Sequence, residues 1–430
     1  MAGAKNDSRS PWLWIPTVYF MEGMPNALIA TVSVLFFHDL GVSNAATAFY
    51  TSLLYLPWVI KPLWSPAVDI LKTRRQWIWS MQLLLGIMLG GVALMVPAPH
   101  FVQWTVVFFC LLAFSSATHD IAADGFYILA NPEHRQSFFI GWRNICFNGG
   151  VIAARGGMVF LAGWLIKKSA NPALAWSIVF LLGAAVFVCL SVYHHFILPR
   201  PAVDIPKPVS SQGHFLDDFL DTFAAFFRKP KILWPLLFIL SYRLGEAQML
   251  KIVPIFLRDP HQAGGLALDN EQVSLVYGTA GAIAFVCGAL LGGFLVARHG
   301  LRSWLWPMLL AIHLPDAVFI WLAYAQPQHL DIIGVGVALE QFGYGFGFTA
   351  FMIYLLYVAR GEQATAHYAI CTGFMAAGLM IPGLWSGALQ SILGYKHFFL
   401  WTILATIPSF LTALKLPLDP EFGKRSRANQ

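Results

Sequence analysis

Gly292-Gly-Phe-Leu-Val-Ala-Arg298-His-Gly300-Leu-Arg302 and Ser65-Pro-Ala-Val-Asp69-Ile-Leu-Lys72-Thr-Arg74-Arg75 are the two stretches that decide the fold of this chain. Each follows the second long apolar run in one half of the sequence, and each carries a cluster of basic residues. One basic loop alone can reflect no more than the orientation of a membrane protein. Two such loops at the same place in two halves predict a pair of parallel structural repeats.

The composition of the chain is that of a membrane protein. Of its 430 residues 58% are hydrophobic and only 11% are charged, less than half of the charged share of about 25% in an ordinary soluble domain. A membrane span needs about 20 apolar residues in a closed helix, so this length allows about 10 to 14 spans. The net charge of +6 comes from basic residues in short loops, and we therefore expect no nucleic-acid partner.

The apolar runs divide the chain into two halves of six helices, which predicts an all-α membrane protein of about 12 transmembrane helices. Residues 1–198 form the first half, 199–231 a polar linker and 232–430 the second half with a basic tail. Within the linker, residues 214–227 are amphipathic and could lie along the membrane surface. The runs lie near 12–37, 44–62, 76–96, 101–129, 137–166, 172–198, 232–257, 271–297, 303–325, 332–358, 366–393 and 397–415.

The distribution of basic residues predicts that both termini lie in the cytoplasm. With that orientation the opposite side keeps only Lys167, Lys168, Arg258 and Lys396. The cytoplasmic side then carries Lys61, Lys72, Arg74, Arg75, Arg135, Arg200, Lys207, Arg228, Lys229, Lys231, Arg298, Arg302, Arg360 and the basic tail.

Ionisable residues inside the predicted spans mark the candidate site. Each costs at least about 2.5 to 3.5 kcal/mol at a helix centre, so each needs a partner or a water-filled cavity. Because acids and bases are balanced over several helices, we expect a polar cavity where the two halves meet. These residues are Glu22, His119, Asp120, Asp124, Arg143, Arg155, Arg243, Glu246, Lys251, His313, Asp316 and Glu340.

Asp120 and Asp124 are four residues apart and share one face of the fourth helix. Two carboxylates in a poorly solvated site cannot both ionise cheaply, so one of them could hold a proton. If Arg143 on the next helix lies opposite, its charge favours ionisation of one acid. A permanent salt bridge that locks the helices together is the alternative interpretation.

The seventh helix places Arg243 and Glu246 one turn apart, with Lys251 two turns beyond Arg243. Such a group suits an anionic or hydroxyl-rich solute. Arg243 and Glu246 could equally neutralise each other, whereas Lys251 has no acid at helical spacing.

The tenth helix carries Glu340-Gln341-Phe-Gly343-Tyr344-Gly345-Phe-Gly347, with Glu340 and Tyr344 on one face. A carboxylate and a phenol that face a cavity suit the hydroxyls of a sugar. The three glycines can also be ordinary positions of close helix packing.

Two further patterns have weaker functional interpretations. The spacing of His119 and Asp124 matches the H-x-x-x-x-D of some acyltransferases, in which histidine is a general base. It lies in mid-span without a second acyltransferase feature, so we expect no enzyme. His313, Pro315 and Asp316 predict a kink with a satisfied polar pair in place of a metal site.

Several of these segments resemble the muropeptide permease family of the major facilitator superfamily, the AmpG-type transporters. The matching segments occur in the same order over most of the chain. They are Glu22-Gly23-Met24-Pro25, Lys61-Pro-Leu-Trp64-Ser65-Pro66-Ala-Val-Asp69, Ser115-Ser-Ala-Thr-His-Asp120-Ile-Ala-Ala-Asp124, Gly141-Trp142-Arg143, Tyr242-Arg243-Leu-Gly-Glu246-Ala, and Glu340-Gln341 with the glycines that follow.

The resemblance implies the major facilitator fold and the proton-coupled import of a disaccharide peptide across the bacterial inner membrane. The chain departs from the family at Ile70, where members commonly have a basic residue, and in 371–393, where members commonly have an arginine. It also lacks an additional span in the linker. Related importers carry siderophores, and a siderophore is therefore the alternative solute. A receptor of the same fold would bind a solute without transporting it.

These considerations give each candidate residue a predicted role in alternating access by the two halves. We expect no cofactor, with the proton gradient as the driving force, and no motif predicts a metal site. We expect a monomer in the lipid bilayer that binds a small-molecule solute. The proton-coupling candidates are Asp124 or Asp120 first, then Glu246 and Glu340; the substrate-binding candidates are Glu22, Trp142, Arg143, Arg243, Lys251, Gln341 and Tyr344; the gating candidates are Asp69, Lys72, Arg74, Arg75, Arg298 and Arg302.

Overall fold

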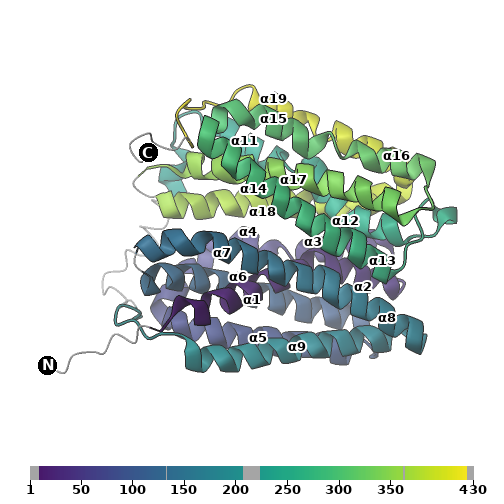
Figure 1. Ribbon diagram of the computed structural model, residues 1–430, viewed down its shortest axis with the longest axis horizontal. Coiled ribbons are helices and arrows are strands. Elements are labelled where there is room, and N and C mark those ends of the chain that lie inside the picture. The colour runs from purple at the N-terminus through teal and green to yellow at the C-terminus, as the bar shows by residue number, and fades with distance from the viewer. Residues whose placement is uncertain (1–8, 132, 207–222, 362–363, 424–430) are drawn as a thin grey trace. The chain divides into compact units, whose positions relative to one another are not determined.

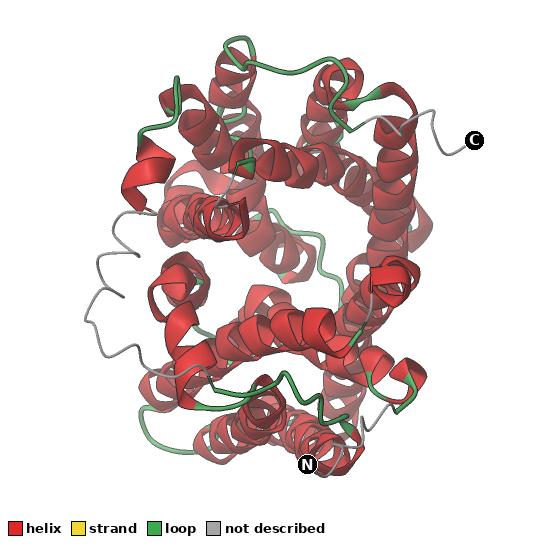
Figure 2. Ribbon diagram, turned by 90° about the vertical axis from the view of Figure 1, so that its left-hand side faces the viewer, coloured by secondary structure: helices red, strands yellow, loops and turns green. Residues whose placement is uncertain are grey.

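A computed structural model of the protein describes residues 9–131, 133–206, 223–361 and 364–423. Every regular element within these ranges is helical, which confirms the predicted all-α fold class (Figures 1 and 2). Part of the predicted amphipathic stretch 214–227 lies outside the described residues.

Nine helices within these ranges are long and apolar enough to cross a membrane. Large apolar side chains on them are exposed, such as Val335 at 71% and Leu290 at 66%, as expected for a surface that faces lipid. All of the predicted apolar runs are helical, but some are made of two shorter helices. The number of twelve spans therefore stays a prediction.

The helices group into two compact units, and residues 60–211 with the N-terminal segment up to Gly41 form the first. In this unit α5 packs along both α6 and α9, and α1 packs on α7 (Figure 1). Its helices are α1 (Ile15–Ala27), α2 (Ser33–Asp39), most of α4 (Leu56–Leu71), α5 (Arg74–Met95), α6 (Phe101–Ala130), α7 (Glu133–Ile152), α8 (Val159–Ser169) and α9 (Pro172–Ile197).

Glycines allow α1 and α7 to approach closely in the first unit. A Cβ at Gly23 would overlap the carbonyl of Phe147, and a Cβ at Gly150 would lie 2.9 Å from the backbone nitrogen of Met24. Two π-helical turns, Leu28–Val32 and Ala153–Met158, interrupt the same two helical runs. Such turns often occur where a helix carries a functional group.

The second unit contains residues 212–430 and, in addition, residues 42–59 from the first half of the sequence. Within it α14 packs along α17, and α3 and α12 both pack on α18. Its helices are α3 (Asn44–Leu53), α11 (Leu233–Ser241), α12 (Leu244–Arg258), α13 (Asn270–Val273), α14 (Gly281–His299), α15 (Leu301–His313), α16 (Ala317–Ala325), α17 (Leu330–Ala359), α18 (Ala364–Leu404) and α19 (Ile407–Ala413).

Helix α3 belongs to the second unit because glycines on α18 accept it. A Cβ at Gly387 would overlap the carbonyl of Asn44, and a Cβ at Gly383 would overlap the Ser52 hydroxyl. The Asn44 amide also donates to Gln390 Oε1 at 3.0 Å. The boundaries at 198 and 231 divide the chain by sequence, and they stay a prediction.

Two helical runs of the second unit are broken where ionisable residues lie. The first break is at Tyr242–Arg243, between α11 and α12. The second is at 314–316, between α15 and α16, because Pro315 has no backbone N–H to continue the helix. This confirms the kink predicted from Pro315.

Candidate functional site

Arg143 is the centre of an ionic cluster in the first unit. Its guanidinium carbon lies 4.1 Å from the centroid of the Tyr19 ring and 4.4 Å from that of the Tyr127 ring. The same guanidinium forms an ion pair with Asp124, whose Oδ1 also accepts a hydrogen bond from Tyr19 Oη at 3.4 Å. A planar guanidinium can stack on aromatic faces and pair with a carboxylate together. Arg143 thus lies opposite one acid of the Asp120–Asp124 pair, the arrangement that the sequence analysis considered as a condition.

Asp120 has a different basic neighbour. Its carboxylate lies 3.9 Å from Lys61 Nζ on α4, and its side chain is only 13% exposed, whereas that of Asp124 is 50% exposed. The two acids that share a helix face therefore have separate cations. This arrangement favours the salt-bridge interpretation for the pair in this conformation, and their proton-coupling role stays a prediction.

Glu22 completes the cluster of the first unit. Its electrostatic neighbours are Asp124, Asp120, Arg143 and Lys61, and its Oε2 is buried without a hydrogen-bond partner among the described residues. Three acids and two bases thus lie together on α1, α4, α6 and α7, a formal charge of −1. An additional cation, either a proton or a basic group of a solute, would neutralise this cluster.

His119 belongs to a buried polar chain that the sequence analysis missed. His119 Nε2 lies 2.9 Å from Gln82 Nε2, Gln82 Oε1 lies 2.7 Å from His194 Nδ1, and His194 Nε2 lies 2.8 Å from Thr17 Oγ1. Helices α6, α5, α9 and α1 are joined through this chain. His119 therefore bonds to Gln82 while Asp124 pairs with Arg143, an arrangement that does not resemble an acyltransferase site.

Trp142 lies beside Arg143 on α7 but contacts different residues. Its ring packs edge-on against Trp12, with 5.0 Å between the centroids, and it is 41% exposed. Consecutive helical residues point about 100° apart, so Trp142 does not join the Arg143 cluster. Its predicted role in substrate binding stays untested.

Asp204 holds the start of α5, where two gating candidates lie. Its two carboxylate oxygens accept hydrogen bonds from the backbone N–H groups of Arg74 and Arg75, at 2.9 and 3.0 Å. The side chains of these arginines donate to backbone carbonyls, Arg74 to Gly125 and Arg75 to Leu198, each at 3.2 Å. Asp204 is one of four acids in the polar linker, and only its position soon after the sixth helix could have suggested this contact.

The other gating candidates are less constrained. Lys72, Arg298 and Arg302 are exposed, and Lys72 Nζ lies 5.5 Å from the centroid of the Trp77 ring. The side chain of Asp69 lies outside the described residues. Of the predicted latch residues, Asp69, Lys72, Arg74 and Arg75, the two arginines make side-chain hydrogen bonds, and the gating role of all four stays a prediction.

We expect Asp204→Ala to lower the stability of the protein slightly. A carboxylate at a helix N-terminus contributes about 0.3 to 1 kcal/mol, and the two backbone N–H groups would lose their acceptor. Thermal unfolding of the purified protein in detergent measures the change. Asp331→Ala in the exposed first turn of α17 is the control, because it removes a carboxylate from a helix N-terminus without removing such backbone hydrogen bonds. We expect the larger effect for Asp204→Ala, and an equal effect of both variants would contradict the assignment.

Arg243 is the corresponding cation of the second unit. It is 5% exposed and donates a hydrogen bond to Tyr344 Oη on α17. Its guanidinium carbon also lies 5.2 Å from the centroid of the Tyr344 ring and 5.0 Å from that of Phe348. Each unit therefore contains a buried or half-buried arginine that contacts tyrosine. In the first unit Arg143 on α7 contacts tyrosines on α1 and α6, and in the second Arg243 at the start of α12 contacts Tyr344 on α17.

Three buried carboxylates lie together in the second unit, and one of them, Glu246, follows Arg243 by three residues. Glu246, Asp316 and Glu340 are 1%, 1% and 2% exposed, and one oxygen from each lies within 4.8 Å of the others. The Gln341 amide donates to Glu340 Oε2 at 2.9 Å. The structure thus brings together the candidates Glu246, Glu340 and Gln341, and it adds Asp316.

His313 bonds to a residue other than Asp316. Its Nε2 lies 3.2 Å from the hydroxyl of Ser409 on α19. The polar pair at the kink is therefore His313 with Ser409, and the expected His313–Asp316 pair is wrong.

Lys251 contacts residues 42–59, the segment from the first half of the sequence that packs in the second unit. Its Nζ donates to the carbonyl of Thr51 at 3.1 Å and lies 4.9 Å from the centroid of the Tyr55 ring. Lys251 is 2% exposed. In this conformation it anchors the segment 51–55, and its predicted contact with a substrate anion stays a prediction.

The glycines of α17 are positions of close packing, as one of the two interpretations predicted. A Cβ at Gly343 would overlap the carbonyl of Ala311, and one at Gly345 would overlap the carbonyl of Phe285. A Cβ at Gly347 would lie 2.6 Å from the carbonyl of Met308. These glycines place Glu340 and Tyr344 close to α14 and α15.

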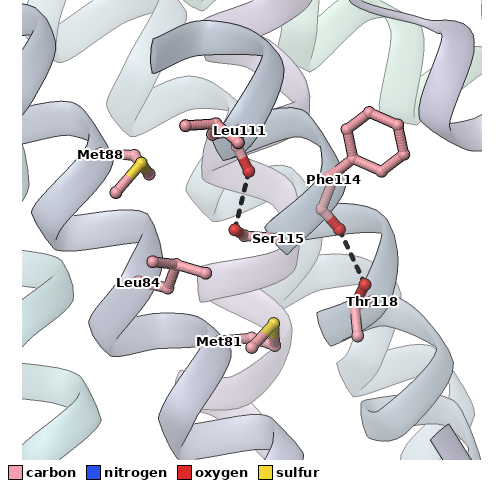
Figure 3. A pocket seen from close by; sticks show the side chains of 7 residues that line it. All are labelled: Met81, Leu84, Met88, Leu111, Phe114, Ser115 and Thr118. Atoms are coloured by element: carbon pink, nitrogen blue, oxygen red, sulfur yellow. Dashed lines mark hydrogen bonds between the residues drawn. The ribbon is translucent and has the colours of Figure 1, made fainter. Parts of the chain in front are cut away.

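A hollow of about 220 Å³ between α5 and α6 holds none of the predicted site residues (Figure 3). The hydroxyls in its wall are already bonded within α6, Ser115 to the Leu111 carbonyl at 2.7 Å and Thr118 to the Phe114 carbonyl at 2.8 Å. Its lining is apolar, so it is unsuited to a charged solute. The hollow is lined by Met81, Leu84, Met88, Leu111, Phe114, Ser115 and Thr118.

Apolar helices of spanning length that bury clusters of ionisable side chains define a multi-pass membrane protein of the transporter class. The chain belongs to the Major Facilitator Superfamily, whose family model matches residues 17–381. The major facilitator fold expected from the two basic loops is confirmed.

The resemblance to AmpG-type permeases is also confirmed. The chain is 25% identical over 401 residues to the anhydromuropeptide permease of Escherichia coli strain K12, which covers 92% of this chain and 77% of that protein. It is 23% identical over 406 residues to a Rickettsia conorii protein that carries the name AmpG 4, with 92% and 94% covered.

Solved structures show the same fold. A D-xylose–proton symporter superposes with a TM-score of 0.71 at 10% identity, over 96% of this chain and 99% of that one. The D323A mutant of the nucleoside transporter NupG superposes with a TM-score of 0.70 at 15% identity, over 94% and 99%. These two neighbours act on different solutes, so the fold leaves the solute of this chain open.

Proposed function

We propose that this protein is a secondary active transporter that imports a peptidoglycan-derived muropeptide, an anhydro-sugar peptide, together with protons. The observation that carries this proposal is the similarity to the anhydromuropeptide permease of E. coli along 92% of this chain. We further propose that it resides in the bacterial inner membrane with both termini in the cytoplasm, as the basic loops indicate.

The chemistry of the two clusters supports such a solute. A muropeptide combines sugar hydroxyls with peptide carboxylates. Arg143 with Tyr19 and Tyr127, and Arg243 with Tyr344, offer guanidinium groups for carboxylates and phenols for hydroxyls. The acids beside them could couple binding to proton movement.

The breaks in the helices support transport by alternating access. Helices interrupted near the middle of the membrane are common at the binding sites of secondary transporters, because freed backbone groups and helix ends can contact the solute. Such breaks occur here at Tyr242–Arg243 and at 314–316. We propose that the two halves move against each other during transport, with Arg74, Arg75, Arg298 and Arg302 at the cytoplasmic gate.

Uptake by the purified protein in proteoliposomes tests this proposal. With an imposed inward proton gradient, we expect labelled anhydromuropeptide to accumulate, and collapse of the gradient with a protonophore to stop accumulation. Iron-free siderophores, iron-loaded siderophores and small sugars serve as competitors. Empty liposomes are the control.

Three outcomes would overturn the proposal. Accumulation of an iron-loaded siderophore and not of the muropeptide would assign the alternative solute. Binding without uptake would make the protein a receptor. A chemically modified product that required His119 would make it an enzyme.

A further inference from the structure

Asp316 occupies a helix-capping position without capping the helix. It precedes the first residue of α16, where an aspartate carboxylate ordinarily accepts a hydrogen bond from the backbone N–H two or three residues later. Here the side chain makes no such bond, and the N–H groups of Ala317, Val318 and Phe319 bond to backbone carbonyls. The Asp316 carboxylate is 1% exposed and accepts no hydrogen bond from the first turn of α16.

The carboxylate is directed instead at two other acids. Neither of its oxygens has a hydrogen-bond partner among the described residues, and an oxygen of Asp316 lies within 4.8 Å of oxygens of Glu246 and Glu340. The three acids come from α12, the α15–α16 break and α17, so tertiary packing brings them together. Gln341 adds a buried Oε1 that has no hydrogen-bond partner within the described ranges.

Three carboxylates at this distance in a dry site cannot all carry a negative charge, because each would lose its hydration and repel the others. Two buried bases accompany Glu246 on α12, and each donates a hydrogen bond to a neutral oxygen: Arg243 to Tyr344 Oη and Lys251 to the Thr51 carbonyl. Three acids and these two bases leave a formal charge of −1, which one bound proton would neutralise.

The ionisable groups of the neighbouring helices have other environments. His313 contacts Ser409 and Tyr395 donates to Asp259 at 2.5 Å. His367 on α18 is buried against the Phe226 ring, with 5.4 Å between the centroids. Lys396 and His397 on α18 and Arg298 and His299 on α14 are exposed, and α11 and α19 contain no ionisable residue.

We propose that Glu246, Asp316 and Glu340 together form the binding site for the coupling proton, and that Asp316 is an essential member of it. The inference rests on the proposed proton-coupled transport. Carboxyl groups so close can share a proton among their oxygens, and its arrival or loss changes the charge at the break between α15 and α16. This places coupling in the second unit, at a carboxylate neither of whose oxygens has a hydrogen-bond partner among the described residues.

Infrared spectroscopy of the purified full-length protein tests the site without any solute. A protonated buried carboxyl group has a C=O stretch that is separate from the backbone absorption. We expect Asp316→Asn to remove part of this band near neutral pH. Asp331→Asn, an exposed acid on the same helix as Glu340, is the matched control and should leave the band unchanged.

Transport measurements test the coupling. One coupled proton and a gradient of about one pH unit allow about tenfold accumulation of a neutral solute complex. We expect Asp316→Asn to reduce the accumulation of labelled anhydromuropeptide to a ratio of about one, the value without coupling. Exchange of labelled for unlabelled solute should persist, because exchange needs no net proton movement.

Each result has a defined meaning. An unchanged carboxyl band, or full accumulation by Asp316→Asn, would overturn the site. Accumulation driven by a sodium gradient in place of a proton gradient would overturn the choice of ion. If the wild-type protein neither accumulates nor exchanges the muropeptide, the proposed solute fails, while the infrared result still decides the proton site. Glu340→Gln carries the same test if Asp316→Asn does not fold.

Discussion

Arg143→Ala is expected to reduce solute uptake by about a hundredfold, which corresponds to about 2.7 kcal/mol. The arginine contacts two tyrosine rings, each worth about 0.5 to 2 kcal/mol, and an ion pair to the half-exposed Asp124 adds at most about 1 kcal/mol after solvent screening. Without it, Tyr19, Tyr127 and Asp124 lose the group that holds them in one arrangement. Initial uptake rates in proteoliposomes measure the effect.

The conservative variant separates geometry from charge. Arg143→Lys keeps the positive charge, but an ammonium group cannot stack as a plane between two rings. We expect it to recover less than about a tenth of the uptake. Lys168→Ala, which removes an exposed cation on α8, is the control. Wild-type uptake by Arg143→Ala would contradict the central position of this residue.

Gly345→Ala is expected to destabilise the protein by about 1 to 3 kcal/mol. The added Cβ would overlap the carbonyl of Phe285, and backbone atoms cannot rotate away as a flexible side chain can. The change would force α14 and α17 apart, along the contact that supports Glu340 and Tyr344. Thermal unfolding and the yield of monodisperse protein in detergent measure this loss.

Gly293→Ala provides the matched control, because nothing lies within 4 Å of its added Cβ. Alanine favours a helix over glycine by about 1 kcal/mol, so this variant should be as stable as the wild type or slightly more stable. The two substitutions are chemically identical and are predicted to act in opposite directions. Equal unfolding midpoints would show that α14 and α17 do not depend on this close approach.

The periodic and compositional features of the chain were predictable from sequence. The apolar runs became helices, Pro315 broke a helix, and the glycines of α17 are close-packing positions. Each of these properties depends on residues close to one another along the chain. A contact of Arg143 with one of the two acids was foreseeable, because α6 and α7 are consecutive, but the choice of Asp124 over Asp120 was not.

The contacts that were missed join residues distant in sequence. Asp316 was expected to satisfy His313, three residues away, yet its environment is set by α12 and α17. Asp204 could not be matched to the start of α5 without knowing how the chain returns after α9. The chain of His119, Gln82 and His194 required the packing of three helices.

Because α3 packs in the second unit, its final contacts can form only late in synthesis. Helix α3 emerges early from the ribosome, but Gly383 and Gly387, which accept it, are made near the end. Contacts between such distant parts of a chain form slowly, because the intervening chain must be ordered first. During that time the face of α3 with Thr47, Thr51 and Ser52 lacks its final partner. The nascent protein therefore has a specific late step, in which an early helix joins a late one.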